Sequence, residues 1–172
     1  LPFMSELLWL EIGHAQTIGI SDHFEYLLDG VFEEYEMKAR SYGFKVGMEI
    51  DGSKWVDEAL GLGNDYFVYH CRDSHGEYRG LEKLLSTDKP VIIAHPFTME
   101  TDLKRVPADC FIEINNRYIW RHDWRRRLPQ ITGERKYVIS SDAHQPNWIN
   151  QNVARYVCSE MNIKETLLFP PL

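Results

Sequence analysis

The sequence predicts an α/β fold built on a parallel sheet. Short runs of β-forming residues alternate with helix-like stretches along the chain, as βαβ crossovers require. One of these runs, "VIIA" at 91–94, is apolar throughout, as expected of a strand that is buried on both faces. A length of 172 residues with 44% hydrophobic residues suits one globular domain spanning residues 1–172.

The elements follow one another in a regular order. We expect strands at 17–23, 44–51, 65–70, 91–96, 110–116 and 137–144. We expect helices between them, at 30–43, 53–61, 78–86, 119–128 and 147–162. Gly43 is placed to end the first of these helices, and Ser53 is placed to cap the second. The opening segment 1–16 has apolar residues at helical spacing and is also expected to be a helix.

Composition excludes several classes of protein. The net charge of −7 argues against non-specific nucleic-acid binding by the whole surface. No apolar run approaches the ~20 residues that a transmembrane helix needs. The widely spaced cysteines Cys71, Cys110 and Cys158 form no disulfide framework, which indicates a reducing, cytoplasmic environment.

Each expected strand ends at or near a residue type that binds metal ions. In a closed parallel barrel the carboxyl ends of the strands meet at one mouth, where active sites lie. A mixture of imidazoles and carboxylates suits Zn, Mn or Fe ions. Several such ligands at one mouth predict more than one ion, which is typical of phosphoester hydrolysis. The strand-end residues are His23, Glu49, His70, His95, Glu113, Asp142 and His144.

Six short motifs, in order, resemble those of the PHP (polymerase and histidinol phosphatase) family. They are "SDH" at 21–23, "GMEI" at 47–50, the histidine that ends "DYFVYH" at 65–70, "AHP" at 94–96, "EINN" at 113–116 and "SDAH" at 141–144. The resemblance implies a distorted (β/α)7 TIM-like barrel with a site for two or three metal ions. It also implies metal-dependent hydrolysis of a phosphoester.

The resemblance assigns a role to each ligand. Glu49 would bridge two ions, and His70 and His95 would bind one of them. Asp142 would bind the other, while His23 and His144 would bind a third ion in members that have three.

The chain departs from the family at its start. The first strand of the family ends in a His-x-His pair, whereas the first histidine here is His14, in a helix-like stretch. The expected barrel therefore lacks its first strand and the ligands on it. We expect the natural gene product to begin upstream of Leu1, with a short strand that ends in His-x-His.

Arg117 and Asn115 are the candidate substrate-binding residues. Arg117 follows Asn115 by two residues and could meet a phosphate group bidentately. We assign catalytic roles to Asp142, His144 and Arg117. Glu113 either touches the site or pairs with Arg117.

Two further features have two interpretations each, and four other residues are expected to have structural roles. Asp22 either orients a ligand or accepts a hydrogen bond at a strand end. The segment "WRHDWRRR" at 120–127 is either a nucleic-acid patch or, as the acidic chain favours, an amphipathic helix with inward tryptophans and solvated arginines. His14, His75 and His122 are expected at the surface or on helices, and Cys71 in the core.

The sequence thus predicts a metal-dependent phosphoesterase that acts on a small phosphorylated substrate in the cytoplasm. Two alternatives remain: a degenerate PHP domain without catalysis, and an exonuclease module of the PHP type.

Overall fold

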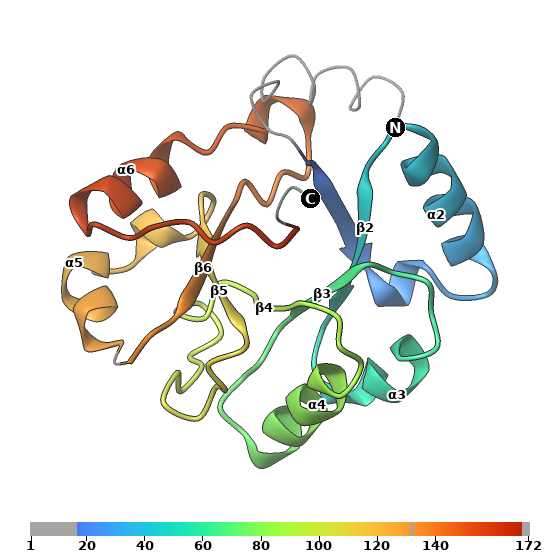
Figure 1. The fold of residues 1–172 in the computed structure, drawn as a ribbon, viewed down its shortest axis with the longest axis horizontal. Helices are drawn as coiled ribbons and strands as arrows, with labels where there is room; N and C mark the ends of the chain where they lie inside the picture. Colours follow the sequence, from blue (N-terminus) through green and yellow to red (C-terminus); the bar gives the residue numbers. More distant parts are fainter. Residues whose placement is uncertain (1–16, 132, 170–172) are drawn as a thin grey trace.

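The computed structural model describes residues 17–131 and 133–169 and contains a six-stranded parallel sheet curled into a half-barrel. The strands lie side by side in chain order, and helices cover the outside of the curl (Figure 1). All six expected strands are present, which confirms the α/β fold with a parallel sheet. Their bounds are β1 Gly19–His23, β2 Lys45–Ile50, β3 Tyr66–Tyr69, β4 Val91–Ile93, β5 Phe111–Asn115 and β6 Lys136–Ser140.

The helices alternate with the strands. The α-helices are α2 Val31–Ser41, α3 Val56–Ala59, α4 His75–Leu85, α5 Trp124–Arg127 and α6 Asn152–Glu160. Short 3-10 turns accompany them: η1 Phe24–Tyr26, η2 Ser53–Trp55, η3 Ile119–Arg121, η4 Leu128–Gln130 and η5 Pro146–Trp148. The helix expected over 1–16, with His14, lies outside the described residues.

Two expected helices are interrupted. The helix predicted over 119–128 is split because His122 adopts an extended backbone, after which the Asp123 side chain caps α5 by accepting a hydrogen bond from the Arg126 N–H. The helix predicted over 147–162 begins only at Asn152. There the Asn116 side-chain oxygen accepts hydrogen bonds from the N–H groups of Val153 and Ala154, at 2.9 and 3.0 Å.

Capping agrees with the prediction at one helix and differs from it at another. Gly43 follows α2 with a φ of 79°, as predicted for a residue that ends a helix. Ser53 was expected to cap a helix, but it is the first residue of η2, which has no side-chain cap. The serine that caps is Ser74, whose hydroxyl accepts a hydrogen bond from the Glu77 N–H at the start of α4. This S-x-x-E pattern was readable in the sequence.

Successive strand residues face opposite sides of the sheet. One face packs against the helices and buries residues such as Met48, Phe67 and Ile112 in the main core. Cys71 belongs to this core, as predicted. The inner face carries a smaller apolar cluster of Tyr66, Val68, Ile92, Ala94 and Phe111.

The segment after α6 returns to the sheet. The Thr166 N–H donates a 2.7 Å hydrogen bond to the Tyr137 carbonyl on β6, the last strand of the sheet. Leu168 and Phe169 then pack against the inner cluster, where the Phe169 ring lies 6.0 Å from that of Tyr66. In Figure 1 this segment runs in red from α6 toward the centre of the fold. It therefore pairs with part of the edge of β6 that no other strand of the described sheet covers.

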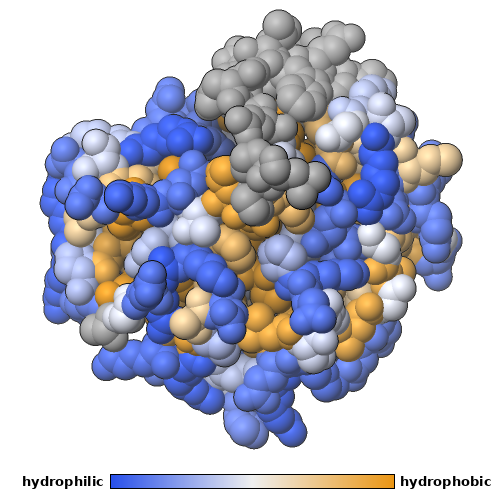
Figure 2. Space-filling model, viewed as in Figure 1, coloured by the Kyte–Doolittle hydropathy of each residue, from blue (hydrophilic) through white to orange (hydrophobic). Residues whose placement is uncertain are grey.

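Hydrophobic residues show through the middle of the molecule in the view down its shortest axis, and hydrophilic residues dominate its periphery (Figure 2). Among the residues that the structure describes, no helix combines the length and the apolar character needed to cross a membrane.

Gly47 provides a test of how the inner face packs. Gly47 on β2 pairs in register with Tyr66 on β3, and a Cβ at Gly47 would overlap the buried Tyr66 ring. Gly47→Ala is therefore expected to lower the free energy of unfolding by about 1–3 kcal/mol, measured by urea denaturation. Gly61→Ala is the control, because no atom lies within 4 Å of the added Cβ there. Equal unfolding free energies for the two variants would contradict the packing.

Candidate functional site

The predicted site residues lie at one edge of the sheet, where the carboxyl ends of the strands meet. They come from every strand or from the residues directly after it. From β1 to β6 they are His23, Glu49, His70, His95, Asn115, Arg117, Asp142 and His144.

The first group is centred on Glu49. Its Oε1 lies 2.8 Å from His70 Nε2 and 3.6 Å from His23 Nε2. Asp51 joins on the far side of His70, with its Oδ1 3.4 Å from Nδ1. Burial alone would raise the pKa of Glu49 and lower that of His70, but the hydrogen bond and charge attraction between them outweigh it. As a result the pKa of Glu49 is lowered and that of His70 is raised, which favours the ionised pair.

The second group is centred on Glu113, which is buried. One carboxylate oxygen accepts a hydrogen bond from the His95 backbone N–H and lies 3.2 Å from His95 Nδ1. The other oxygen accepts a hydrogen bond from the Ser140 hydroxyl. Burial alone would raise the pKa of Glu113, but these contacts, above all those with His95, outweigh it and lower the pKa. The interpretation that Glu113 pairs with Arg117 is therefore wrong.

Asp142 joins the second group to the rim of the site. Asn115 Nδ2 donates to Asp142 Oδ2 at 3.1 Å and lies 3.4 Å from His95 Nδ1. Burial, together with the negative charges of Glu113 and Glu49, raises the pKa of Asp142. His144 Nδ1 lies 3.2 Å from Asp142 Oδ1.

The backbone that presents two of these residues is unusual. The sixth strand was expected to run to residue 144, but β6 ends at Ser140 and Asp142 has a φ of 51°. The side chains of Asp142 and His144 therefore meet because the chain turns, and not because they share one side of an extended strand. His95 also has a positive φ, of 25°. Such conformations cost about 1–3 kcal/mol each for residues other than glycine and cluster at functional sites.

Arg117 lies over the His144 ring. Its Nη1 is 2.9 Å from Nδ1 and 3.3 Å from Nε2, so it faces the ring and is not aimed at one nitrogen. Nη1 is also 3.6 Å from Asp142 Oδ1. The guanidinium carbon of Arg117 also lies 5.0 Å from the centre of the Trp148 ring, so an aromatic side chain flanks this arginine.

A row of rings connects the groups. The His23 and His70 ring centres are 5.6 Å apart, those of His70 and His95 4.7 Å, and those of His95 and Tyr118 4.9 Å. The predicted residues therefore form one continuous row along the mouth.

The donor types in this row suit a divalent transition metal. His23 Nδ1 is buried and makes no hydrogen bond, and the carboxylate oxygen Oε1 of Glu25 lies 3.6 Å from it. Within residues 17–131 and 133–169, however, no three His, Cys, Asp or Glu side chains are already arranged to hold one ion. Instead the imidazoles and carboxylates contact one another directly, and an ion would have to replace contacts such as that between Glu49 and His70.

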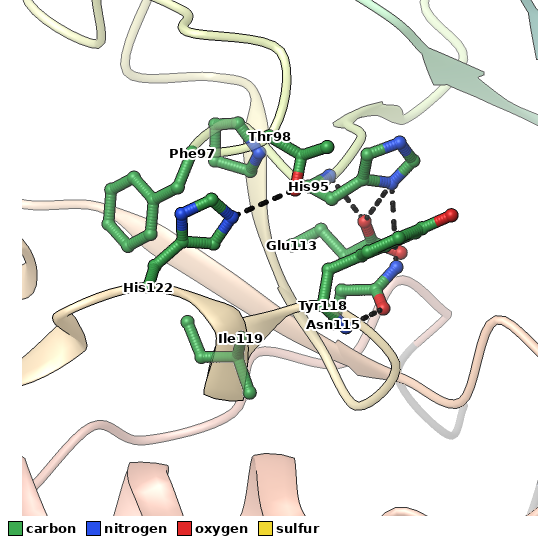
Figure 3. Close-up of a pocket in the computed structure, with 9 residues that line it drawn as sticks. His95, Phe97, Thr98, Glu113, Asn115, Tyr118, Ile119 and His122 are labelled. Carbon is green, nitrogen blue, oxygen red and sulfur yellow. Dashed lines mark hydrogen bonds and ion pairs between the residues drawn. The ribbon is translucent and has the colours of Figure 1, made fainter.

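A cavity of ≈10 Å³, about the size of one water molecule, lies beside His95. Figure 3 shows His95, Glu113 and Asn115 on one side of it and His122 on the other, where His122 Nε2 lies 3.0 Å from the Thr98 hydroxyl oxygen. Burial and the neighbouring arginines Arg127 and Arg121 lower the pKa of His122. His122 was treated as a surface or helix residue, and its place on this wall was not foreseen.

Asp51 and Ser140 are also contacts that the sequence interpretation omitted. Asp51 lies two residues after Glu49, and His144 lies two residues after Asp142. This shared spacing was the sequence signal that could have identified Asp51. Asp22 accepts a hydrogen bond from the His23 backbone N–H at 2.9 Å and is exposed, so it acts at the strand end.

The segment 120–127 differs from the predicted amphipathic helix. Trp124 is buried, but Trp120 is 60% exposed, and the guanidinium carbon of Arg121 lies 5.3 Å from its ring centre. The two tryptophans face different environments because the helix is broken between them.

Comparison with known proteins gives no relative: no family model, curated protein or solved structure matches the chain. The resemblance to the PHP family remains an expectation from its motifs.

The buried carboxylate of Glu113 gives a stability test. Each carboxylate oxygen of Glu113 accepts a hydrogen bond, and Glu113→Gln replaces one of these oxygens with an NH2 group, which donates. We therefore expect a loss of about 1–3 kcal/mol in the free energy of unfolding at neutral pH. Because the fold lowers the pKa of Glu113, its charge stabilises the protein at pH values above 4.5, the ordinary pKa of this side chain. The difference from the unsubstituted protein should therefore shrink as the pH falls below that value. Exposed Glu58 provides the control, Glu58→Gln. Identical unfolding curves for both variants at neutral pH would refute the role of Glu113.

Proposed function

We propose that the chain is a metal-dependent phosphoesterase of the PHP type, acting on a small phosphorylated substrate in the cytoplasm. The observation that supports this most is the convergence of imidazoles and carboxylates from five strands, with Arg117 from a sixth, on one row. We further propose that the curled sheet belongs to a distorted (β/α)7 barrel, as the consecutive parallel order of its strands suggests.

The protein's own residues would divide the work along the row. Glu49, His70 and His95 would hold one Zn, Mn or Fe ion, and Glu49 with Asp142 would hold a second. His23 and His144 would serve a third ion if one binds. Bound ions of this kind supply Lewis-acid polarisation of a phosphoryl oxygen and lower the pKa of water.

Arg117 would bind the substrate phosphate. Its guanidinium is at the rim, 3.6 Å from Asp142 Oδ1, and its planar donors match two phosphate oxygens. Asn115 would orient Asp142 through the 3.1 Å hydrogen bond between them. His144 is half exposed beside Arg117 and could exchange a proton with a leaving group.

Two observations keep the alternatives in view. Direct pairing of the donors with one another, as between Glu49 and His70, favours a degenerate PHP domain without catalysis. Exposed Trp120 with Arg121 offers a surface on which a base could stack, as an exonuclease would need.

Substitution in the row tests the proposal. His95→Gln and Asp142→Asn should each reduce hydrolysis of p-nitrophenyl phosphate by more than about 100-fold, since ligand loss should exceed the effect of losing a supporting group. Asparagine is chosen at 142 because it tolerates a positive φ. His75→Gln and Asp109→Asn are controls, both at exposed positions. The assay uses protein reconstituted with Zn²⁺, Mn²⁺ or Fe²⁺.

The outcomes separate the three interpretations. Hydrolysis in the unsubstituted protein and the controls, with loss in the two row variants, supports the phosphatase. If the protein releases nucleotides from the ends of single-stranded DNA faster than it hydrolyses aryl phosphates, the exonuclease is favoured. Absence of both activities after reconstitution would leave the non-catalytic domain.

A further inference from the structure

A second cavity, of ≈150 Å³, lies between the loop after β4 and the segment from α5 to Arg135. Phe97 lines both this cavity and the small one beside His95. The volume of the second cavity is roughly ten times the ~10–15 Å³ that a single water molecule requires. There is therefore room for a small polyatomic group next to the wall of the candidate site.

The charge of this cavity is opposite to that of the chain. Lys104, Arg127 and Arg135 line it, and Asp102 is the one carboxylate among its lining residues. The lining thus carries a formal charge of +2 in a protein of net charge −7. In the described part of the chain, none of the three cations forms an ion pair, whereas other arginines and lysines, such as Arg40 and Lys83, do.

The two arginines are held in place by neutral groups. Arg135 donates from Nη1 to the Val106 carbonyl at 2.8 Å and from Nη2 to the Leu103 carbonyl at 2.9 Å. Its Nε is buried without a hydrogen-bond partner, which is unfavourable for a donor removed from water. The guanidinium of Arg127 lies 4.4 Å from the centre of the Phe97 ring, and its Nη1 donates to the Phe97 carbonyl at 3.4 Å.

We propose that this cavity binds an oxyanion, the phosphate or carboxylate group of a small ligand. An oxyanion would offset the net positive charge of the lining and accept hydrogen bonds from planar arginine donors, whose geometry suits phosphate and carboxylate oxygens. The site is separate from the strand-end row and does not depend on hydrolysis there. Arg127 nevertheless adjoins it, since its Nη1 lies 3.5 Å from Nδ1 of His122 on the wall of the first cavity.

Binding is measured on the intact chain by NMR of the arginine Nε–H groups, titrated with inorganic phosphate and, separately, with acetate. We expect saturable shifts of the Arg135 and Arg127 signals and no shift of the Arg126 signal. Lys104→Gln and Arg127→Gln should each weaken binding by about tenfold or more, the effect of losing one charge-assisted contact. Arg126→Gln, at an exposed position on the same helix, is the matched control.

The titrations distinguish the ligand class and the place of binding. Saturation by phosphate alone identifies a phosphate site, and saturation by acetate as well identifies a general oxyanion site. Arg117→Gln must leave the Arg135 shift unchanged, because Arg117 belongs to the mouth. The proposal is overturned if neither anion moves the Arg135 signal, or if Arg126→Gln weakens binding as much as Arg127→Gln. Since no turnover is measured, failure of the phosphatase leaves this result unaffected.

Discussion

The parallel direction of all six strands is the constraint on which the rest of the structure depends. Parallel strands place their carboxyl ends at one edge, and the two-residue period of a strand decides which side chains face inward there. His23 and Glu49 are register partners on β1 and β2, and Asn115 and Ser140 are partners on β5 and β6. Residues far apart in the chain meet because of this geometry, and the residues that follow β3, β4, β5 and β6 supply the rest of the candidate residues.

The carboxylates of the row are stable at positions shielded from solvent because each contacts a histidine. The partly buried carboxylate of Glu49 and the buried one of Glu113 each pair with a histidine, and the pKa of each carboxyl is lowered despite burial. An unpaired carboxylate in such a position would cost far more than a neutral group. These pairs also keep ligand-type side chains oriented toward each other. The same arrangement is consistent with a site that exchanges these contacts for an ion and with a stable domain that binds none.

Alternation of apolar runs was enough to predict the six strands and the edge at which the candidate residues gather. The details that failed depend on tertiary contacts. β6 stops at Ser140 because the chain turns at Asp142, and α6 starts late, where Asn116, the residue directly after β5, caps it. Predicting the partner of Glu113 would have required the position of the His95 backbone N–H, which the spacing of residues in the sequence does not reveal. Trp120 and His122 were misjudged because a break after η3, absent from the helical pattern, redirects the segment.

X-ray absorption at the zinc edge, on protein reconstituted with Zn²⁺, tests most directly whether the row is a metal centre. We predict imidazole nitrogens around zinc at about 2.0–2.1 Å. Their signal should fall in His70→Gln and His95→Gln, and it should be unchanged in His75→Gln. Zinc surrounded only by oxygen ligands, or the same spectrum in all three variants, would show that the row is not a metal centre.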